Sequence, residues 1–298
     1  MLGKLPTNFE RKFVAMDEFT SLNAGLDALE IQKKTARNWR SKFSNFTYAI
    51  IAFVTLLVIW QVAIKISGVK SYILPSPKQV FSAMQTQWKS GILPHAIFRS
   101  FSRGVEGYAL ALLVATPLGL LLGLNKGLRM VIGPVLLGLQ QLPSVAWVPA
   151  AIIWFGLSPA TIFAVVLLGA VPSIANGLIS GIDQIPPLYL KVASVLRANK
   201  WQRIRHFILP AAWPGYLAGL EQGWAFAWRS LMAAELIAVS PSLGLGVGQL
   251  LDVGRQLGDM SLVIGTIFVI MAIGIFVEKI FFSPLRKRTL RNRGLTQN

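Results

Sequence analysis

The run from Met130 to Ile182 constrains this chain most, because its 53 residues include no Asp, Glu, Lys or Arg. The hydrocarbon core of a bilayer is about 30 Å thick and takes about 20 apolar residues per helix. The run is therefore long enough for two membrane crossings. With 54% hydrophobic residues and a mean hydropathy of +0.57, the chain is predicted to be an all-α integral membrane protein.

Uncharged stretches along the chain predict six transmembrane helices. The third and fourth share the 53-residue run and are separated by a predicted turn at residues 156–159. The fifth is the least uniform, because it contains Glu221, Arg229 and Glu235. The predicted spans are 43–64, 107–125, 131–155, 160–182, 211–238 and 260–282.

The positions of Lys and Arg orient these spans. If both termini are cytoplasmic, 21 of the 29 basic residues fall on the cytoplasmic side, as the positive-inside rule requires. We therefore predict a cytoplasmic N-terminal tail (1–42), a transmembrane domain (43–285) and a basic cytoplasmic C-terminal tail (286–298). The net charge of +17 then reflects topology and attraction to membrane lipid rather than binding of nucleic acid.

The composition also excludes several kinds of chemistry. The chain has no Cys, and its two histidines, His95 and His206, are predicted on opposite sides of the membrane, so no metal site or cofactor is expected. It lacks the Gly-x-x-x-x-Gly-Lys-Ser/Thr motif that cradles ATP phosphates. Glycines in the stretch 244–248 have no βαβ pattern around them and predict a flexible outer loop or a re-entrant turn. The chain is therefore not predicted to be an enzyme.

The segment 183–210 is too long to be a simple turn between two spans. Its apolar residues recur at helical spacing, and five basic residues occupy the opposite side. This pattern predicts one or two short amphipathic helices on the cytoplasmic side. By pattern alone, such helices either insert into the groove of a partner protein or lie on the lipid surface.

The third span is interrupted by two prolines six residues apart, each of which removes a backbone donor. The helix is therefore expected to kink or unwind. Non-helical backbone at membrane depth survives only inside protein or along a watery cavity. We favour a solute path over a purely structural kink with its glutamines bonded across helices. The candidate path residues here are Gln140, Gln141, Pro143, Ser144, Trp147 and Pro149.

The fifth predicted span adds two further candidates for the path, Arg229 and Glu235. Glu221 and Glu235 fall within about 40° of each other on one helix face. On a straight helix, Arg229 is too distant from both glutamates, in angle and along the axis, to pair with either. We therefore expect its partner in another span or in a second subunit. Arg229 either attracts an anionic solute or forms a buried structural pair.

The segment 183–210 resembles the coupling loop of ATP-binding-cassette importer permeases. That motif begins Glu-Ala-Ala, has a Gly four residues after the last Ala, and ends in Leu-Pro. Here Lys191 stands in place of the Glu and Arg197 in place of the Gly, while the final Leu-Pro is intact. The resemblance places the ATPase-coupling residues at Lys191, Val192, Ala193, Arg197, Arg203, Leu209 and Pro210. Further segments resemble the nitrate, sulfonate and taurine branch of that family, which includes some bicarbonate permeases: 73–80, 107–120, 141–149, 154–156, 228–235 and 244–246.

This resemblance covers about residues 45–285 and implies a type I importer permease fold in a bacterial inner membrane. It implies a homodimer that works with two cytoplasmic ATPase subunits and an extracytoplasmic solute-binding protein, by alternating access. The implied cargo is a small anion, with an alkanesulfonate or taurine-type solute favoured and nitrate or bicarbonate as the alternative. A secondary transporter is the rival class, but the sequence shows no convincing internal repeat.

Overall fold

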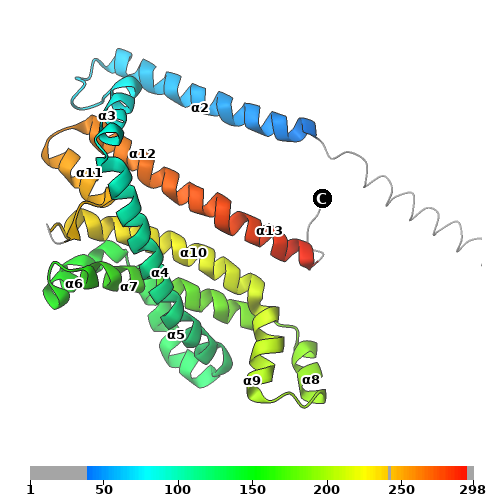
Figure 1. The fold of residues 1–298 in the computed structure, drawn as a ribbon. Helices are drawn as coiled ribbons and strands as arrows, with labels where there is room; N and C mark the ends of the chain where they lie inside the picture. Colours follow the sequence, from blue (N-terminus) through cyan, green and yellow to red (C-terminus); the bar gives the residue numbers. More distant parts are fainter. Residues whose placement is uncertain (1–38, 241–242, 294–298) are drawn as a thin grey trace, which may run out of the picture. The chain divides into compact units, whose positions relative to one another are not determined.

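A computed structural model describes residues 39–240 and 243–293 and divides the chain into two units, 1–62 and 63–298. Most of the predicted N-terminal tail (1–38) and the last five residues lie outside the described part. Every regular element within the described ranges is a helix (Figure 1), as the composition predicts.

The first helices in chain order are longer than the predicted spans. Helix α4 begins fifteen residues before the predicted start of the second span, at Ile92. The elements up to the segment 183–210 are α2 (Trp39–Ser67), α3 (Pro77–Lys89), α4 (Ile92–Leu124), α5 (Lys126–Gln141), η1 (Ser144–Trp147), α6 (Val148–Phe155) and α7 (Pro159–Asp183).

The remaining helices include two π-helical segments, η2 and η4, each continuous with its neighbours. The last three elements run without a break from Met260 to Asn292, across the predicted domain boundary at residue 285. The elements are α8 (Pro187–Val195), α9 (Lys200–Gln202), η2 (Arg203–Ile208), α10 (Leu209–Ile237), α11 (Val247–Gln256), α12 (Met260–Val277), η4 (Glu278–Phe282) and α13 (Ser283–Asn292).

Four helices in the described part are long and apolar enough to cross a membrane: Ile50–Ser67, Ile92–Leu124, Pro159–Asp183 and Met260–Asn292. A fifth span results if the bent pair of α5 with the η1–α6 segment counts as one crossing. Helix α10 has 29 residues, enough to span about 44 Å. Its charged residues Glu221, Arg229 and Glu235 lower its hydropathy below that of the others.

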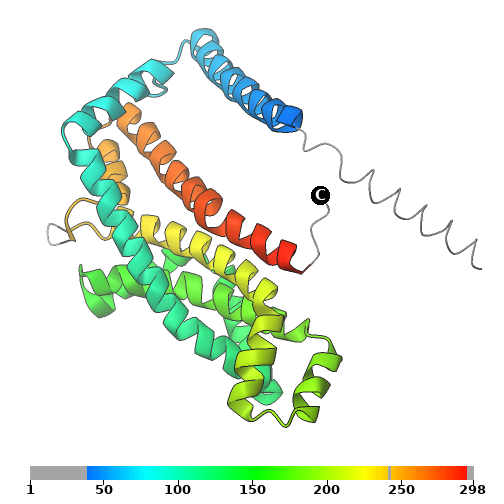
Figure 2. The same cartoon turned by 45° about the vertical axis from the view of Figure 1, so that its right-hand side comes forward.

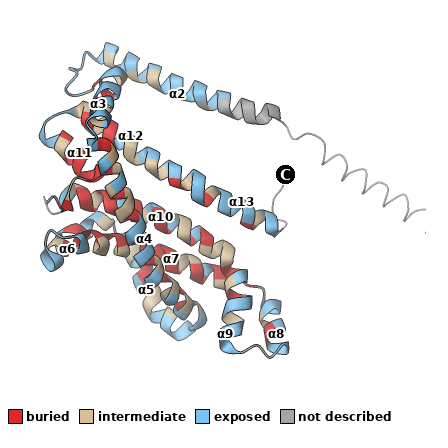
Figure 3. Cartoon of the chain, viewed as in Figure 1, coloured by how far each residue is buried: buried red, intermediate tan, exposed pale blue. Residues whose placement is uncertain are grey.

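Helices α7 and α10 form the centre of the fold, lie side by side in both views (Figures 1 and 2), and each carry more buried residues than any other described helix (Figure 3). Four glycines make their crossing close: a Cβ atom on Gly177 would lie 2.3 Å from the Gly219 Cα, and one on Gly215 would lie 2.5 Å from the Gly181 Cα. Each pair of glycines is spaced four residues apart on its own helix, the small-residue pattern that lets transmembrane backbones approach. Lipid tails are as apolar as Leu side chains, so burying apolar side chains does little to hold two transmembrane helices together. The close packing of the two backbones therefore stabilises the α7–α10 pair.

Helix α3 lies in the segment between the first two predicted spans. Ser76 caps it by accepting a hydrogen bond from the Gln79 backbone N–H, and the Gln79 side chain accepts one from the Ser76 N–H. Residues 243–246 form a turn that leads directly into α11. Gly246 and Gly248 are buried against Glu235, so the turn is packed rather than the flexible loop that the sequence also allowed.

Candidate functional site

The predicted kink in the third span is confirmed. Helix α5 ends at Gln141, a short 3₁₀ segment follows Pro143, and Pro149 stands in the first turn of α6, with a bend of 99° across the break. Proline at a helix start is favourable because its missing N–H would have no intrahelical partner. The two prolines therefore turn the chain here without leaving further donors unpaired.

Gln140 connects this break to a polar groove. Its Oε1 accepts a hydrogen bond of 2.9 Å from Nδ2 of Asn176 on α7. Asn176 lines a cavity of about 430 Å³ between α7 and α10. The polar lining side chains are Ser173, Asn176 and Ser180 from α7, Gln184 directly after α7, and Gln222 from α10.

The polar lining follows one face of each helix. The α7 residues recur at spacings of three and four, which places them on one side. Ser173 is buried, and its hydroxyl has no hydrogen-bond partner among the described residues. A buried hydroxyl without a partner has lost its hydration, so a bound solute that hydrogen-bonds to it would restore that lost interaction.

Arg229 lies seven residues after Gln222, within about 20° of it on the face of α10. The side chain is exposed in this chain. Its Nε donates to the carbonyl of Ala225 at 3.1 Å, and its guanidinium lies 4.5 Å from the ring centroid of Phe226. Within the described part of the chain, both contacts are with its own helix, so a partner in a second subunit stays a prediction.

Glu235 is fully buried and does not line the polar groove. Its carboxylate accepts hydrogen bonds from the Ser100 hydroxyl (2.6 Å), Nη1 of Arg103 (2.9 Å) and the backbone N–H of Gly248 (3.1 Å). Arg103 also donates to the Leu243 carbonyl. The carboxylate thus links the end of α10, helix α4 and the first turn of α11.

Glu221, on the same face of α10, is engaged near the middle of the helix. It pairs with Arg286 of α13 at 3.1 Å. The other residues predicted for the path lie at the break itself and outside the cavity lining, with Ser144 and Trp147 half-buried and the rest exposed: Gln141, Pro143, Ser144, Trp147 and Pro149.

The predicted coupling segment forms the short helices that its pattern indicates, α8, α9 and the π-helical η2. Lys191 and Val192 are exposed on α8, whereas Ala193 is buried. Arg203 is half-buried in η2, and Leu209 packs against a cluster that includes Ile208. Large apolar side chains of this segment remain exposed: Leu188, Tyr189, Val192, Val195, Leu196 and Trp201.

Arg197 ends helix α8 in the left-handed region, with φ +48°, the one positive φ of a non-glycine residue in the described part. The N–H groups of Arg197 and Ala198 donate to the carbonyls of Ser194 and Ala193. This is a Schellman arrangement, whose left-handed position is normally Gly. The coupling motif therefore has Gly at this position because the backbone there is left-handed.

Replacing Arg197 with Gly is expected to raise the free energy of unfolding by about 1 kcal/mol, because the left-handed strain of an L-residue is removed. Thermal unfolding of the detergent-solubilised protein measures this. Arg203→Gly, in a right-handed helical turn, is the control and should lower stability by about 1 kcal/mol. If both variants lose the same amount of stability, the interactions of the Arg197 side chain contribute more to stability than the backbone strain costs.

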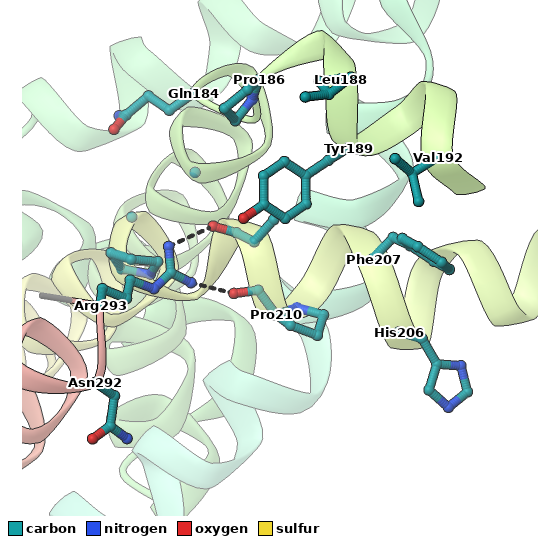
Figure 4. Close-up of a pocket in the computed structure, with 14 residues that line it drawn as sticks. Gln184, Pro186, Leu188, Tyr189, Val192, His206, Phe207, Pro210, Asn292 and Arg293 are labelled. Atoms are coloured by element: carbon teal, nitrogen blue, oxygen red, sulfur yellow. Dashed lines mark hydrogen bonds between the residues drawn. The ribbon is translucent and has the colours of Figure 1, made fainter. Parts of the chain in front are cut away.

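A larger cavity, about 1200 Å³, lies behind the coupling segment and is lined by α8, η2, the start of α10 and the end of α13. Figure 4 shows Arg293 directed at the beginning of α10, where its guanidinium donates to the carbonyls of Pro210 and Ala211. These carbonyls lie in the first turn of α10, where the coupling segment ends. The end of the last helix is thus tied to the coupling segment.

The sequence reasoning missed Asn176, Ser173 and Gln222 as groove residues. Their polar spacing within otherwise apolar spans was a usable signal, as was the pair of Gly-x-x-x-Gly patterns at Gly177 and Gly215. Neither signal identifies which helices meet.

Residues 115–282, more than half of the chain, match the family described as "Binding-protein-dependent transport system inner membrane component". The chain belongs to this family. It is a permease of the ATP-binding-cassette importers, and a multi-pass component of the inner membrane.

Three relatives illustrate the range of the family around this permease. The bicarbonate transport permease CmpB of Synechococcus elongatus is 28% identical over 86% of this chain and 94% of its own length. The taurine transport permease TauC of Escherichia coli is 27% identical over 70% and 78%, respectively. The riboflavin transport permease RibX of Chloroflexus aurantiacus is 31% identical over 72% and 78%.

Among solved structures, a chain of the MetNI methionine transporter in an inward-facing conformation aligns with a TM-score of 0.53. The alignment covers 69% of this permease and 96% of that chain at 16% identity, and so shows the fold alone. The fold is that of a type I importer permease. The family implies an ATPase and a solute-binding protein as partners, and its members are permease subunits rather than enzymes.

Proposed function

We propose that this permease imports a small anion, most specifically an alkanesulfonate of the taurine type, by alternating access. The observation that carries the proposal is the groove between α7 and α10. It combines neutral hydrogen-bonding groups around Asn176 and Gln222 with the cation Arg229 two turns further along α10. Sulfonate oxygens accept hydrogen bonds from amides and hydroxyls, and their charge favours a guanidinium.

The permease acts in this proposal as a homodimer with six spans and cytoplasmic termini. Exposed polar and charged side chains at membrane depth are costly in lipid and are tolerated inside protein or along water. The groove residues Ser180 and Gln222, and Arg229 beyond the groove on α10, are exposed in the single chain. A second copy facing the groove would enclose them and leave a polar path between the two subunits.

Uptake of taurine should fall by at least about tenfold in Arg229→Gln, because a hydrogen bond to a charged group contributes about 1.5–3 kcal/mol. Proteoliposomes containing the permease, its ATPase and its binding protein provide the measurement. Arg291→Gln, which removes an exposed charge near the end of α13, is the control and should transport normally. Unchanged anion uptake in Arg229→Gln would contradict the role of Arg229.

The same uptake assay distinguishes between the candidate solutes and between an importer and a secondary transporter. Nitrate and bicarbonate, the second candidates, are tested alongside taurine, and the solute that stimulates ATP hydrolysis identifies the cargo. Uptake without ATP or an ATPase subunit would contradict the importer and favour a secondary transporter.

The coupling segment would dock on the ATPase through its exposed apolar residues. Val195, with 81% of its surface exposed at the end of α8, presents a side chain that lipid or protein must cover. Ala193, two residues earlier and on the opposite face of α8, is buried, so Val195 points away from the rest of the permease. This arrangement supports insertion of α8 into a partner's groove, the first of the two roles that the sequence left open.

Val195→Asp should abolish co-purification of the ATPase, because burying the unpaired carboxylate in the interface would cost several kcal/mol. The permease itself should keep its thermal stability, since the side chain is exposed. Gln85→Asp, which adds the same charge to an exposed site on α3, is the control. Retention of the ATPase by Val195→Asp would argue for a lipid-facing α8.

A further inference from the structure

Two adjoining cavities lie between the last helix of the permease and the α4–α10 pair. The first, about 550 Å³, has an aromatic and aliphatic lining contributed by α4, α10 and the η4 region, including Phe101, Val105 and Phe281. The second, about 690 Å³, lies against Trp213 and Tyr216. Leu285 and Arg288 of the last helix line both cavities, so the two adjoin at these side chains and together form one groove along the helix.

The two ends of this groove differ in chemistry. The first cavity is apolar except for Arg288 and the polar tips of Tyr108 and Trp224. The second has Thr289, Asn292 and Arg293 in its lining. The described residues that line the groove include no acidic side chain, so its polar end is positive.

Arg288 is the one guanidinium of this groove that the protein leaves unpaired within its described residues. Arg293 donates to the carbonyls of Pro210 and Ala211, whereas Arg288 has no hydrogen bond or ion pair there. Arg286, two residues earlier, is neutralised by Glu221 and Glu278. Arg288 therefore offers an uncompensated positive charge to whatever occupies the groove.

A second unsatisfied group lies at the apolar end. Trp224 is 6% exposed, and its indole N–H has no acceptor among the described residues. A buried donor without an acceptor costs free energy, and an ester carbonyl in the groove would be able to accept from it.

The position of the groove along the membrane matches its chemistry. The last helix runs continuously from Met260 to Asn292, and at 1.5 Å per residue Arg288 lies about 42 Å from its start. A bilayer with its headgroup layers is about 40–45 Å thick, with a hydrocarbon core of about 30 Å. If the helix starts at one membrane surface, Arg288 reaches the headgroups of the other, while Val277 lies within the hydrocarbon.

We propose that this groove holds one anionic phospholipid of the inner leaflet, with its headgroup phosphate at Arg288 and an acyl chain along Val105, Phe281 and Leu285. An elongated amphiphile with one negative end fits a groove that is apolar at membrane depth and positive at the headgroup layer. The bound lipid fills the space between α13 and α10 and supports the end of the last helix, where Arg293 holds the start of α10.

The test titrates the purified importer complex with phosphatidylglycerol or with phosphatidylcholine of the same acyl chains, and counts retained lipid by native mass spectrometry. Arg288→Gln should lower phosphatidylglycerol retention about fivefold, the effect of one basic residue near an anionic headgroup. Arg291→Gln, on the same helix but outside both cavities, should change it little. Val105→Trp should block the apolar end and reduce retention of both lipids, whereas Leu113→Trp, exposed on the same α4, should not.

Several outcomes would overturn the proposal. Equal losses in Arg288→Gln and Arg291→Gln would reveal only general attraction to a basic surface. Full retention in Val105→Trp would place the lipid elsewhere, and displacement of the lipid by inorganic phosphate would indicate a site for free phosphate. Absence of retained lipid from the wild-type complex would mean that a protein helix covers the groove.

Discussion

Glu235→Gln is expected to lower the free energy of unfolding of the permease by about 3 kcal/mol, because it breaks a buried ion pair and leaves Arg103 without its counter-charge. The carboxylate accepts three hydrogen bonds, from Ser100, Arg103 and Gly248. An amide places its NH₂ group against one of these donors, so at least one buried donor loses its acceptor. In a detergent thermal-shift assay the apparent melting temperature should fall by roughly 5 °C or more.

Two variants make this test specific. Glu106→Gln removes an exposed carboxylate from the same helix as Arg103 and should leave the melting temperature unchanged. Combining Glu235→Gln with Arg103→Met should recover part of the loss, because the unpaired buried charge is then gone. If Glu235→Gln keeps normal stability but stops uptake, Glu235 acts on the solute path as the sequence predicted.

Gly177→Ala is expected to destabilise the permease by at least about 2 kcal/mol, although Ala is the better helix former. Its Cβ atom would lie 2.3 Å from the Gly219 Cα and 2.8 Å from the Gly219 nitrogen. Both are backbone atoms, so no rotamer change relieves the clash and α7 must move away from α10. Because the polar groove lies between these helices, uptake should fall together with thermal stability.

Gly138→Ala in α5 is the matched control, since no atom lies within 4 Å of the Cβ position there. It should be neutral or stabilise by up to about 1 kcal/mol, because Gly loses more backbone entropy than Ala on folding. A normal melting temperature and uptake in Gly177→Ala would show that the crossing of α7 and α10 is looser than the structure has it.

The local backbone structure at the break and in the coupling segment was predicted well, because its signal is local. Pro143 and Pro149 predict the break because a missing N–H and a fixed φ act within one helical turn. The segment 183–210 predicts short helices because apolar and basic residues alternate at helical spacing. Arg197 was recognised as a departure from the coupling motif, but the left-handed φ that explains the motif's Gly became visible only in the backbone of α8.

The charged residues of α10 were predicted less well. Their angular positions on one helix follow from sequence spacing. In the structure, Glu221 is bound by α13 and Glu235 by α4. The sequence does not say that Ser100 and Arg103, more than 130 residues earlier, reach Glu235. Nor does it say that Arg229 folds back on Ala225 and Phe226.

The sequence alone determined that this protein is a helical membrane protein with a broken span and an exposed amphipathic segment, because hydropathy, proline chemistry and helical spacing act over a few residues. It also carried the motifs by which the family was recognised. Only the tertiary structure decided that α7 and α10 cross through four glycines, that Asn176 and Gln222 share a groove, and that Glu235 is a buried anchor. These features depend on which distant segments meet, and close packing of backbones and buried charges settles that in three dimensions.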